Sequence, residues 1–233
     1  MTGLSITVRV GKGLDAKDFS VHKDLVAHHS PFFKNAVSER WKEGRNNLIE
    51  LTEDEPKIFK IYLSWLYGIR PFKYMTACTK CKTNTCSDYF DLADAFVFGN
   101  KVLDFDFCDM VVDTLCSHAR SRDWIPTEHF FTIWKVSRKD SAPRNLILDT
   151  YAYSGRKRWF DESKMEADEF DLETWRSIAE VLIADREDGT GLDAEMLPWE
   201  NDDDMCRYHL HISETGVCYR DTMKWRAKAG TSE

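Results

Sequence analysis

The chain of 233 residues carries a formal net charge of -8, and 42% of its residues are hydrophobic and 13% aromatic. This composition indicates a folded protein rather than a disordered one, and the length suits one core with an appendage or two small domains. The acidic balance argues against nucleic acid or an anionic membrane as the main partner, because both are bound through clustered lysine and arginine.

The sequence contains no segment typical of a membrane span or a secretion signal. No apolar run approaches the roughly 20 residues that a membrane helix requires, and the start, MTGLSITVRVGKG, lacks the charged and apolar blocks of a signal peptide. We therefore expect a soluble protein of the cytoplasm or nucleus. Because these compartments are reducing, the seven cysteines are expected to be thiols or metal ligands rather than disulfides.

The N-terminal part of the chain alternates between strand and helix patterns. Apolar residues at every second position from Ile6 to Val10 predict a strand, and a Gly-Lys-Gly turn leads to a partner strand over Phe19–Val21. Ser30-Pro31 has the residue types of a helix N-cap and first turn. A third strand is predicted over Leu48–Leu51, and a strongly apolar helix follows from Pro56 to a glycine C-cap at Gly68.

Three motifs in this segment keep a fixed order: Phe19-Ser-Val-His-Lys23, then Leu25-Val-Ala with Ser30-Pro-Phe-Phe33, then a helix that ends in Tyr67-Gly68. Together they resemble the BTB (POZ) domain, whose pattern is F-x-V-H-K, L-A-x-x-S-x-x-F and a helix ending in Y-x-G or Y-T-G. The sequence departs from that pattern at His28-His29 and has Gly rather than Thr after Tyr67. The resemblance covers residues 4–118 and is strongest to the short BTB proteins of fungi.

The resemblance implies an α+β fold, in which a small β-sheet is flanked by helical hairpins. It also implies a protein–protein interaction module that associates with itself or with other proteins. In this family the N-terminal strand and the first helices carry dimerisation, which points to the region of Ile6, Val8, Leu25 and Val26 as an interaction surface.

Two other functions are less well supported. A substrate adaptor for a cullin-type ubiquitin ligase commonly carries a hydrophobic-x-Glu motif between two helices of the BTB domain, but no glutamate occurs between Ile69 and Phe90. The sequence also lacks a nucleophile elbow, an H-E-x-x-H motif and a dinucleotide fingerprint, so we do not expect an enzyme.

Cys78, Cys81 and Cys86 lie close together in a polar loop. The C-x-x-C pair has the spacing of a metal chelate or a redox dithiol, but a fourth ligand and a βαβ context are both missing. Metal binding, redox regulation and spectator thiols all stay open for this loop.

The rest of the chain is predicted to form an all-α extension over 122–184, an acidic linker over 185–204 and a C-terminal tail over 205–233. Apolar stripes predict three helices in the extension, with short connections. The linker combines acidic residues with Gly and Pro, which indicates a solvated segment.

The tail contains the only histidines and cysteines that follow His129: Cys206, His209, His211 and Cys218. Two thiolates and two imidazoles form the tetrahedral set that zinc favours, and His209 and His211 would face the same way from an extended strand. Short fungal BTB proteins end in a similar C-x-Y/F-H-x-H…C tail. Structural zinc is therefore one hypothesis, and a metal-free strand-turn-strand that packs Tyr208, Leu210 and Ile212 is the other.

Overall fold

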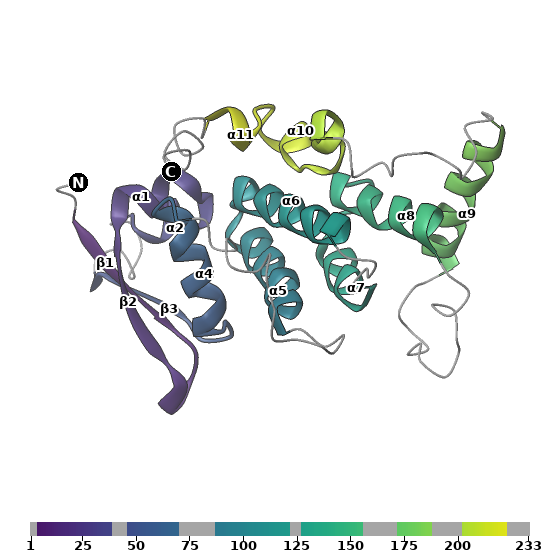
Figure 1. Cartoon of the computed structure of the whole chain (residues 1–233). Coiled ribbons are helices and arrows are strands. Elements are labelled where there is room, and N and C mark those ends of the chain that lie inside the picture. Colours follow the sequence, from purple (N-terminus) through teal and green to yellow (C-terminus); the bar gives the residue numbers. More distant parts are fainter. Residues whose placement is uncertain are drawn as a thin grey trace.

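A computed structural model of the chain describes residues 4–38, 46–69, 87–121, 127–155, 172–187 and 202–222. The strands lie together at one end of the molecule, and helices form the rest (Figure 1). The strands are β1 (Ser5–Val10), β2 (Lys17–His22) and β3 (Leu48–Leu51). The helices are α1 (Lys23–His29), α2 (Pro31–Ala36), α4 (Pro56–Leu66), α5 (Ser87–Val102), α6 (Phe105–Ser121), α7 (Thr127–Val136), α8 (Ala142–Ser154), α9 (Leu172–Glu187), α10 (His211–Glu214) and α11 (Tyr219–Thr222), with 3-10 turns η1 (Gly13–Asp15) and η5 (Asp202–Tyr208).

The sheet has the strand order β2-β1-β3, with β1 antiparallel to β2 and parallel to β3. The predicted alternation is confirmed, because Ile6, Val8 and Val10 on β1 are fully buried while the residues between them are partly exposed. Helix α4 packs on the buried face, where the rings of Phe59 and Phe19 lie 5.1 Å apart. All three strands predicted from the sequence are therefore present.

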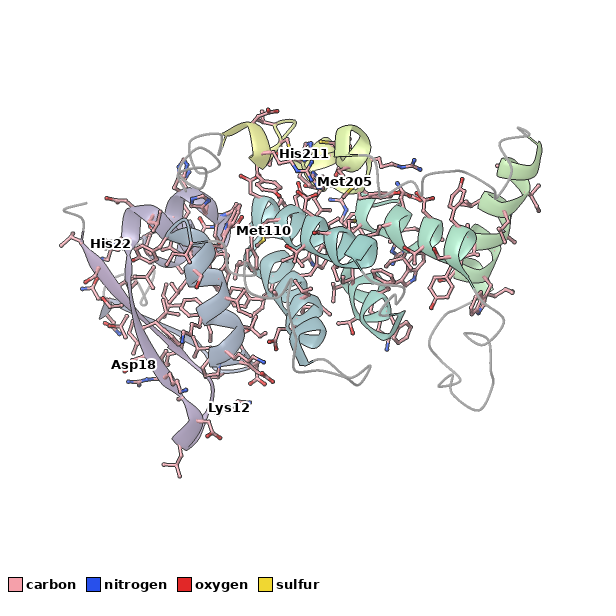
Figure 2. All side chains as sticks on the ribbon, in the orientation of Figure 1. Lys12, Asp18, His22, Met110, Met205 and His211 are labelled. Carbon is pink, nitrogen blue, oxygen red and sulfur yellow. The ribbon has the colours of Figure 1, made fainter. Side chains whose placement is uncertain are left out.

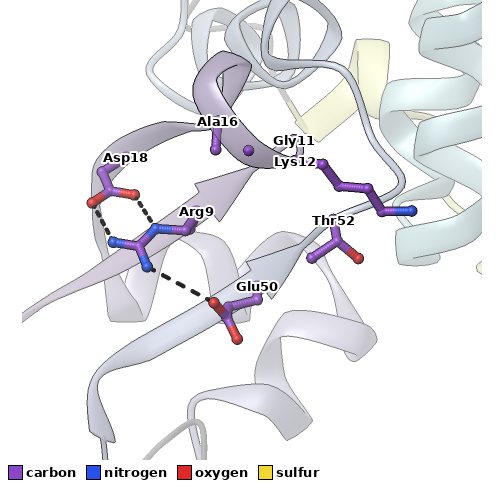
Figure 3. Close-up of a pocket in the computed structure, with 8 residues that line it drawn as sticks. Arg9, Gly11, Lys12, Ala16, Asp18, Glu50 and Thr52 are labelled. Atoms are coloured by element: carbon purple, nitrogen blue, oxygen red, sulfur yellow. Dashed lines mark hydrogen bonds and ion pairs between the residues drawn. The ribbon is translucent and has the colours of Figure 1, made fainter.

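The outer face of the sheet has a shallow hollow beside the β1–β2 turn (Figure 3). Its charged side chains are already paired: Arg9 makes two hydrogen bonds to Asp18 at 2.8 and 2.9 Å, and Lys12 contacts Glu53. These pairs are exposed, so each contributes little to stability. The hollow offers no unpaired charge among its described residues that would recognise a ligand.

An aromatic cluster forms the core beneath the sheet. Tyr62 on α4 packs against Phe98 and Phe107, with ring centroids 5.2 and 5.1 Å apart. The predicted cap at Ser30 is confirmed, because its Oγ accepts the backbone N–H of Phe33 at 3.1 Å. Gly68 ends α4 with φ 76°, a conformation that glycine adopts without steric cost.

A buried acid joins α5 to α6. Asp104 is only 1% exposed, accepts a hydrogen bond from the hydroxyl of Tyr62 at 2.9 Å and caps α6 by accepting the N–H of Phe107 at 3.0 Å. Burial raises the pKa of this carboxyl to about 7, although both hydrogen bonds act in the opposite direction.

Three helices follow α6, as predicted, and α7, α8 and α9 pack one on the next. The chain then returns, so that η5, α10 and α11 lie along α6 and α8 (Figure 1). The last residues of α9, up to Glu187, and the first residues of η5, from Asp202, belong to the predicted acidic linker. The rest of that linker lies outside the described residues. Within the described ranges, no helix combines the length and the apolar character needed to cross a membrane.

Candidate metal centre

The four predicted ligands come together in the tail. Each of Cys206, His209, His211 and Cys218 offers one ligand atom, and these atoms all lie within 4.8 Å of one another. The Sγ of Cys218 is 3.9 Å from Nδ1 of His209, and the two imidazole centroids are 5.2 Å apart. Figure 2 shows His211 beside α6, in the part of the tail that also carries Met205.

The predicted extended strand through His209 and His211 is wrong. Cys206 belongs to the 3-10 turn η5, where the N–H of His209 bonds to its carbonyl at 3.0 Å, and His211 begins α10. The reason is a carboxylate on α6, Asp109, that accepts the backbone N–H groups of Leu210 and His211 at 2.6 and 3.2 Å. Those bonds satisfy the start of a helical turn and bend the chain there.

The metal-free alternative also predicted a strand-turn-strand, and the described tail contains no strand. Tyr208 and Leu210 are buried as that alternative expected, but Ile212 is 59% exposed. The geometry of the tail therefore differs from both forms predicted from the sequence, while the predicted ligand set is brought together.

Helix α6 supplies two carboxylates, one helical turn apart, that contact the imidazoles. Nε2 of His209 lies 2.8 Å from Oδ1 of Asp113, and Nδ1 of His211 lies 2.9 Å from Oδ2 of Asp109. Sequence reasoning missed both acids, which are about 100 residues from the tail. The signal for them is two aspartates four residues apart, and so on the same face of a helix whose other positions include the buried Val111 and Val112.

The two carboxylates differ in charge environment. Burial would raise the pKa of Asp113, but hydrogen bonds from His209, Arg220 and Tyr219 outweigh burial and lower the pKa. Burial raises the pKa of Asp109, only partly opposed by the two histidines and the backbone N–H groups. The difference has a visible cause, since an arginine, Arg220, contacts Asp113 at 2.7 Å.

Burial also affects the thiol of Cys218. It raises the pKa of Cys218 to about 11, and the neighbouring Cys206 thiol acts in the same direction. A metal ion that binds here must therefore displace protons, because thiolates rather than thiols are the ligands.

Three further contacts anchor the tail to the helices around it. The hydroxyl of Tyr208 donates to Asp149 on α8 at 2.7 Å, and Arg207 contacts the same carboxylate at 3.0 Å. On the other side, the ring of Tyr219 lies 5.7 Å from that of Trp65 on α4. The tail thus bridges α4, α6 and α8.

The donor set fits a tetrahedral metal. With Zn–S bonds of about 2.3 Å and Zn–N bonds of about 2.0–2.1 Å, a tetrahedron places its S and N ligands about 3.6 Å apart. The observed 3.9 Å between Cys218 and His209 is close to that value. Four protein ligands would fill the coordination sphere of such a metal, which is typical of a structural site rather than a catalytic one.

Comparison with known protein families identifies the N-terminal part. The family model of the BTB/POZ domain matches residues 4–94. The chain contains a BTB/POZ domain. No curated protein matches the chain. The BTB/POZ match runs from β1 into α5 and ends before α6 and the tail, and the predicted boundary at residue 118 stays a prediction.

The residues predicted as an interaction surface of the BTB/POZ domain are buried or half-buried. Ile6, Val8 and Val26 point into the core with at most 1% exposure, and Leu25 is half-buried. Their side chains therefore support the elements of that region rather than form its outer surface, and the interaction surface stays a prediction. Cys78, Cys81 and Cys86 lie outside the described residues.

Proposed function

We propose that this protein is a BTB/POZ interaction scaffold in which one structural zinc ion holds the C-terminal tail against α6. One observation carries the proposal: four donor atoms of the kinds that zinc prefers lie within 4.8 Å of one another. The tail is short, and segments of this size rarely hold a fold without a metal or a disulfide.

The choice of zinc follows from charge and ligand type. Two thiolates neutralise a divalent cation, and two neutral imidazoles complete a tetrahedral set without adding charge. Carboxylate and carbonyl oxygens, which magnesium and calcium prefer, do not belong to the four-ligand set. With zinc bound, this closed set of borderline and soft ligands would have no net charge, which suits a buried position.

Elemental analysis of the purified full chain tests the metal. We expect one zinc per wild-type chain and a loss of zinc in Cys206→Ser. Cys116→Ala is the matched control, because this buried cysteine of α6 lies outside the four-ligand set and its removal should leave the zinc content unchanged. A wild-type chain free of zinc after expression in zinc-supplemented medium would contradict the proposal.

BTB/POZ domains mediate protein–protein association, and we propose homo- or hetero-association through the region of β1 and α1. Light scattering during size-exclusion chromatography tests the self-association. A mass that rises with concentration supports it, and a strictly monomeric mass at high micromolar concentration contradicts it. A cytoplasmic or nuclear location remains a part of this proposal that imaging of a tagged chain would test.

A substrate-adaptor role for a cullin-type ubiquitin ligase is the weaker alternative. The sequence between Ile69 and Phe90 contains no glutamate, which such a role commonly uses there. A pull-down with a purified cullin tests it, and binding comparable to that of an established adaptor would make this alternative the better account.

A further inference from the structure

Each histidine of the metal centre uses a different ring nitrogen to contact α6. His209 is fully buried and places Nε2 at 2.8 Å from Asp113, while its Nδ1 faces Cys218 at 3.9 Å. A carboxylate accepts hydrogen bonds only, so the nitrogen that contacts it carries the proton. In His209 the lone pair is therefore left on Nδ1, inside the four-ligand cluster.

His211 has the opposite arrangement. Its Nδ1 lies 2.9 Å from Asp109, and its side chain is only 7% exposed. The proton then belongs on Nδ1, and the lone pair is left on Nε2. The two rings thus contact carboxylates one helical turn apart on α6, His209 through Nε2 and His211 through Nδ1.

The carboxylates are themselves held by other donors. Asp109 accepts two backbone N–H groups of the tail, from Leu210 and His211. Asp113 accepts hydrogen bonds from the hydroxyl of Tyr219 and from Arg220. A ring flip at either histidine would leave a buried carboxylate oxygen without one of its donors, which is unfavourable.

From these contacts we infer that Asp109 and Asp113 are positioning residues that make the metal bind through Nδ1 of His209 and Nε2 of His211. The inference rests on the proposed zinc site and adds which atoms ligate and which residues of α6 select them. Carboxylate partners of ligating histidines fix the tautomer and raise the basicity of the ring, and their loss typically lowers metal affinity about 10–100-fold. The two acids would thereby link metal binding to the helix that follows the BTB/POZ match.

Long-range proton–nitrogen NMR correlation on the zinc-loaded, 15N-histidine-labelled full chain tests the inference without any variant. We expect His209 to be protonated at Nε2 and metal-bound at Nδ1, with the reverse in His211. Ligation of both rings through the same nitrogen would overturn the inference and leave the zinc site intact. A chain without zinc would instead overturn the proposed function.

Variants provide a second, independent measurement. Asp113→Asn and Asp109→Asn should each lower zinc affinity about 10–100-fold in a competition titration with a chromophoric chelator. The matched control is Asp149→Asn, which loosens the contact of the tail with α8 but touches neither imidazole. Its zinc affinity and histidine tautomers should stay as in wild type, and equal losses in all three variants would show that α6 acts only as a docking surface.

Discussion

The BTB/POZ domain and the tail are held by different kinds of interaction. The domain buries a continuous apolar core, to which β1, α4 and α5 all contribute. The tail adds Met205, Tyr208 and Leu210 to the same apolar cluster, but it also packs on α6 and α8 through buried carboxylates, each with several donors, and through the four-ligand cluster. Apolar burial requires no bound ion, whereas the polar contacts that are specific to the tail depend on charge balance. From this comparison we expect the BTB/POZ domain to be stable by itself and the attachment of the tail to depend on metal.

The largest effect is expected from breaking the core. Phe59 is fully buried and contacts the rings of Phe19, Phe33 and Phe98, so Phe59→Ala should lower the free energy of unfolding by about 3–5 kcal/mol. Chemical denaturation measures the loss. The same loss is expected with and without a metal chelator, and a loss that disappears in chelator would contradict the separation between the two parts.

Metal removal should act on the tail alone. A ligand present at about 100 times its Kd stabilises the bound form by about 2.7 kcal/mol, so chelation should release residues 202–222 from α6. Hydrogen exchange followed by mass spectrometry should then show faster exchange in the tail. Exchange in β1 and α4 serves as the internal control and should not change, and an unchanged tail would contradict the account.

The core has its own pH dependence, through Asp104. Its pKa is raised from 3.8 to about 7, so the stability that it contributes is full below about pH 4 and is lost as the pH rises towards 7. The groups that face it are the Tyr62 hydroxyl on α4 and Asp106 and Cys108 on α6.

Asp104→Asn removes this titration and keeps an acceptor for the N–H of Phe107. Relative to wild type, the variant should gain about 3 kcal/mol in its free energy of unfolding between pH 5 and pH 8. Urea denaturation at both pH values measures the difference. If wild type and variant differ in free energy of unfolding by the same amount at both pH values, the raised pKa of Asp104 is contradicted.

A smaller effect is expected at the contact between the tail and α8. Tyr208→Phe removes a buried hydroxyl that donates to Asp149, and should cost about 1 kcal/mol. Tyr67→Phe is the matched control in the BTB/POZ domain, since its hydroxyl bonds His22 at an exposed position. The control should change the free energy of unfolding by less than about 0.5 kcal/mol. Equal effects of the two substitutions would contradict a larger contribution from the buried hydroxyl of Tyr208.

Much of the fold was predictable because its signals are local. The alternation through Ile6, the cap at Ser30 and the glycine end of α4 at Gly68 each depend on a few neighbouring residues, and the structure confirms all three. The clustering of Cys206, His209, His211 and Cys218 was predictable for the same reason, since these residues are close in sequence.

What sequence reasoning could not supply was the conformation of the tail. His209 and His211 lie on a bent segment because Asp109 accepts two of its backbone N–H groups, and Asp109 is separated from them by about 100 residues. Contacts between distant segments leave no periodic trace in the sequence. The same separation hides the partnership between Asp113 and His209.

X-ray absorption spectroscopy at the zinc edge of the purified full chain tests the central claim most directly. The account predicts a first shell of two sulfur atoms at about 2.3 Å and two nitrogen atoms at about 2.0–2.1 Å. A sulfur-free shell, a shell of four sulfur atoms, or a protein without zinc would contradict it.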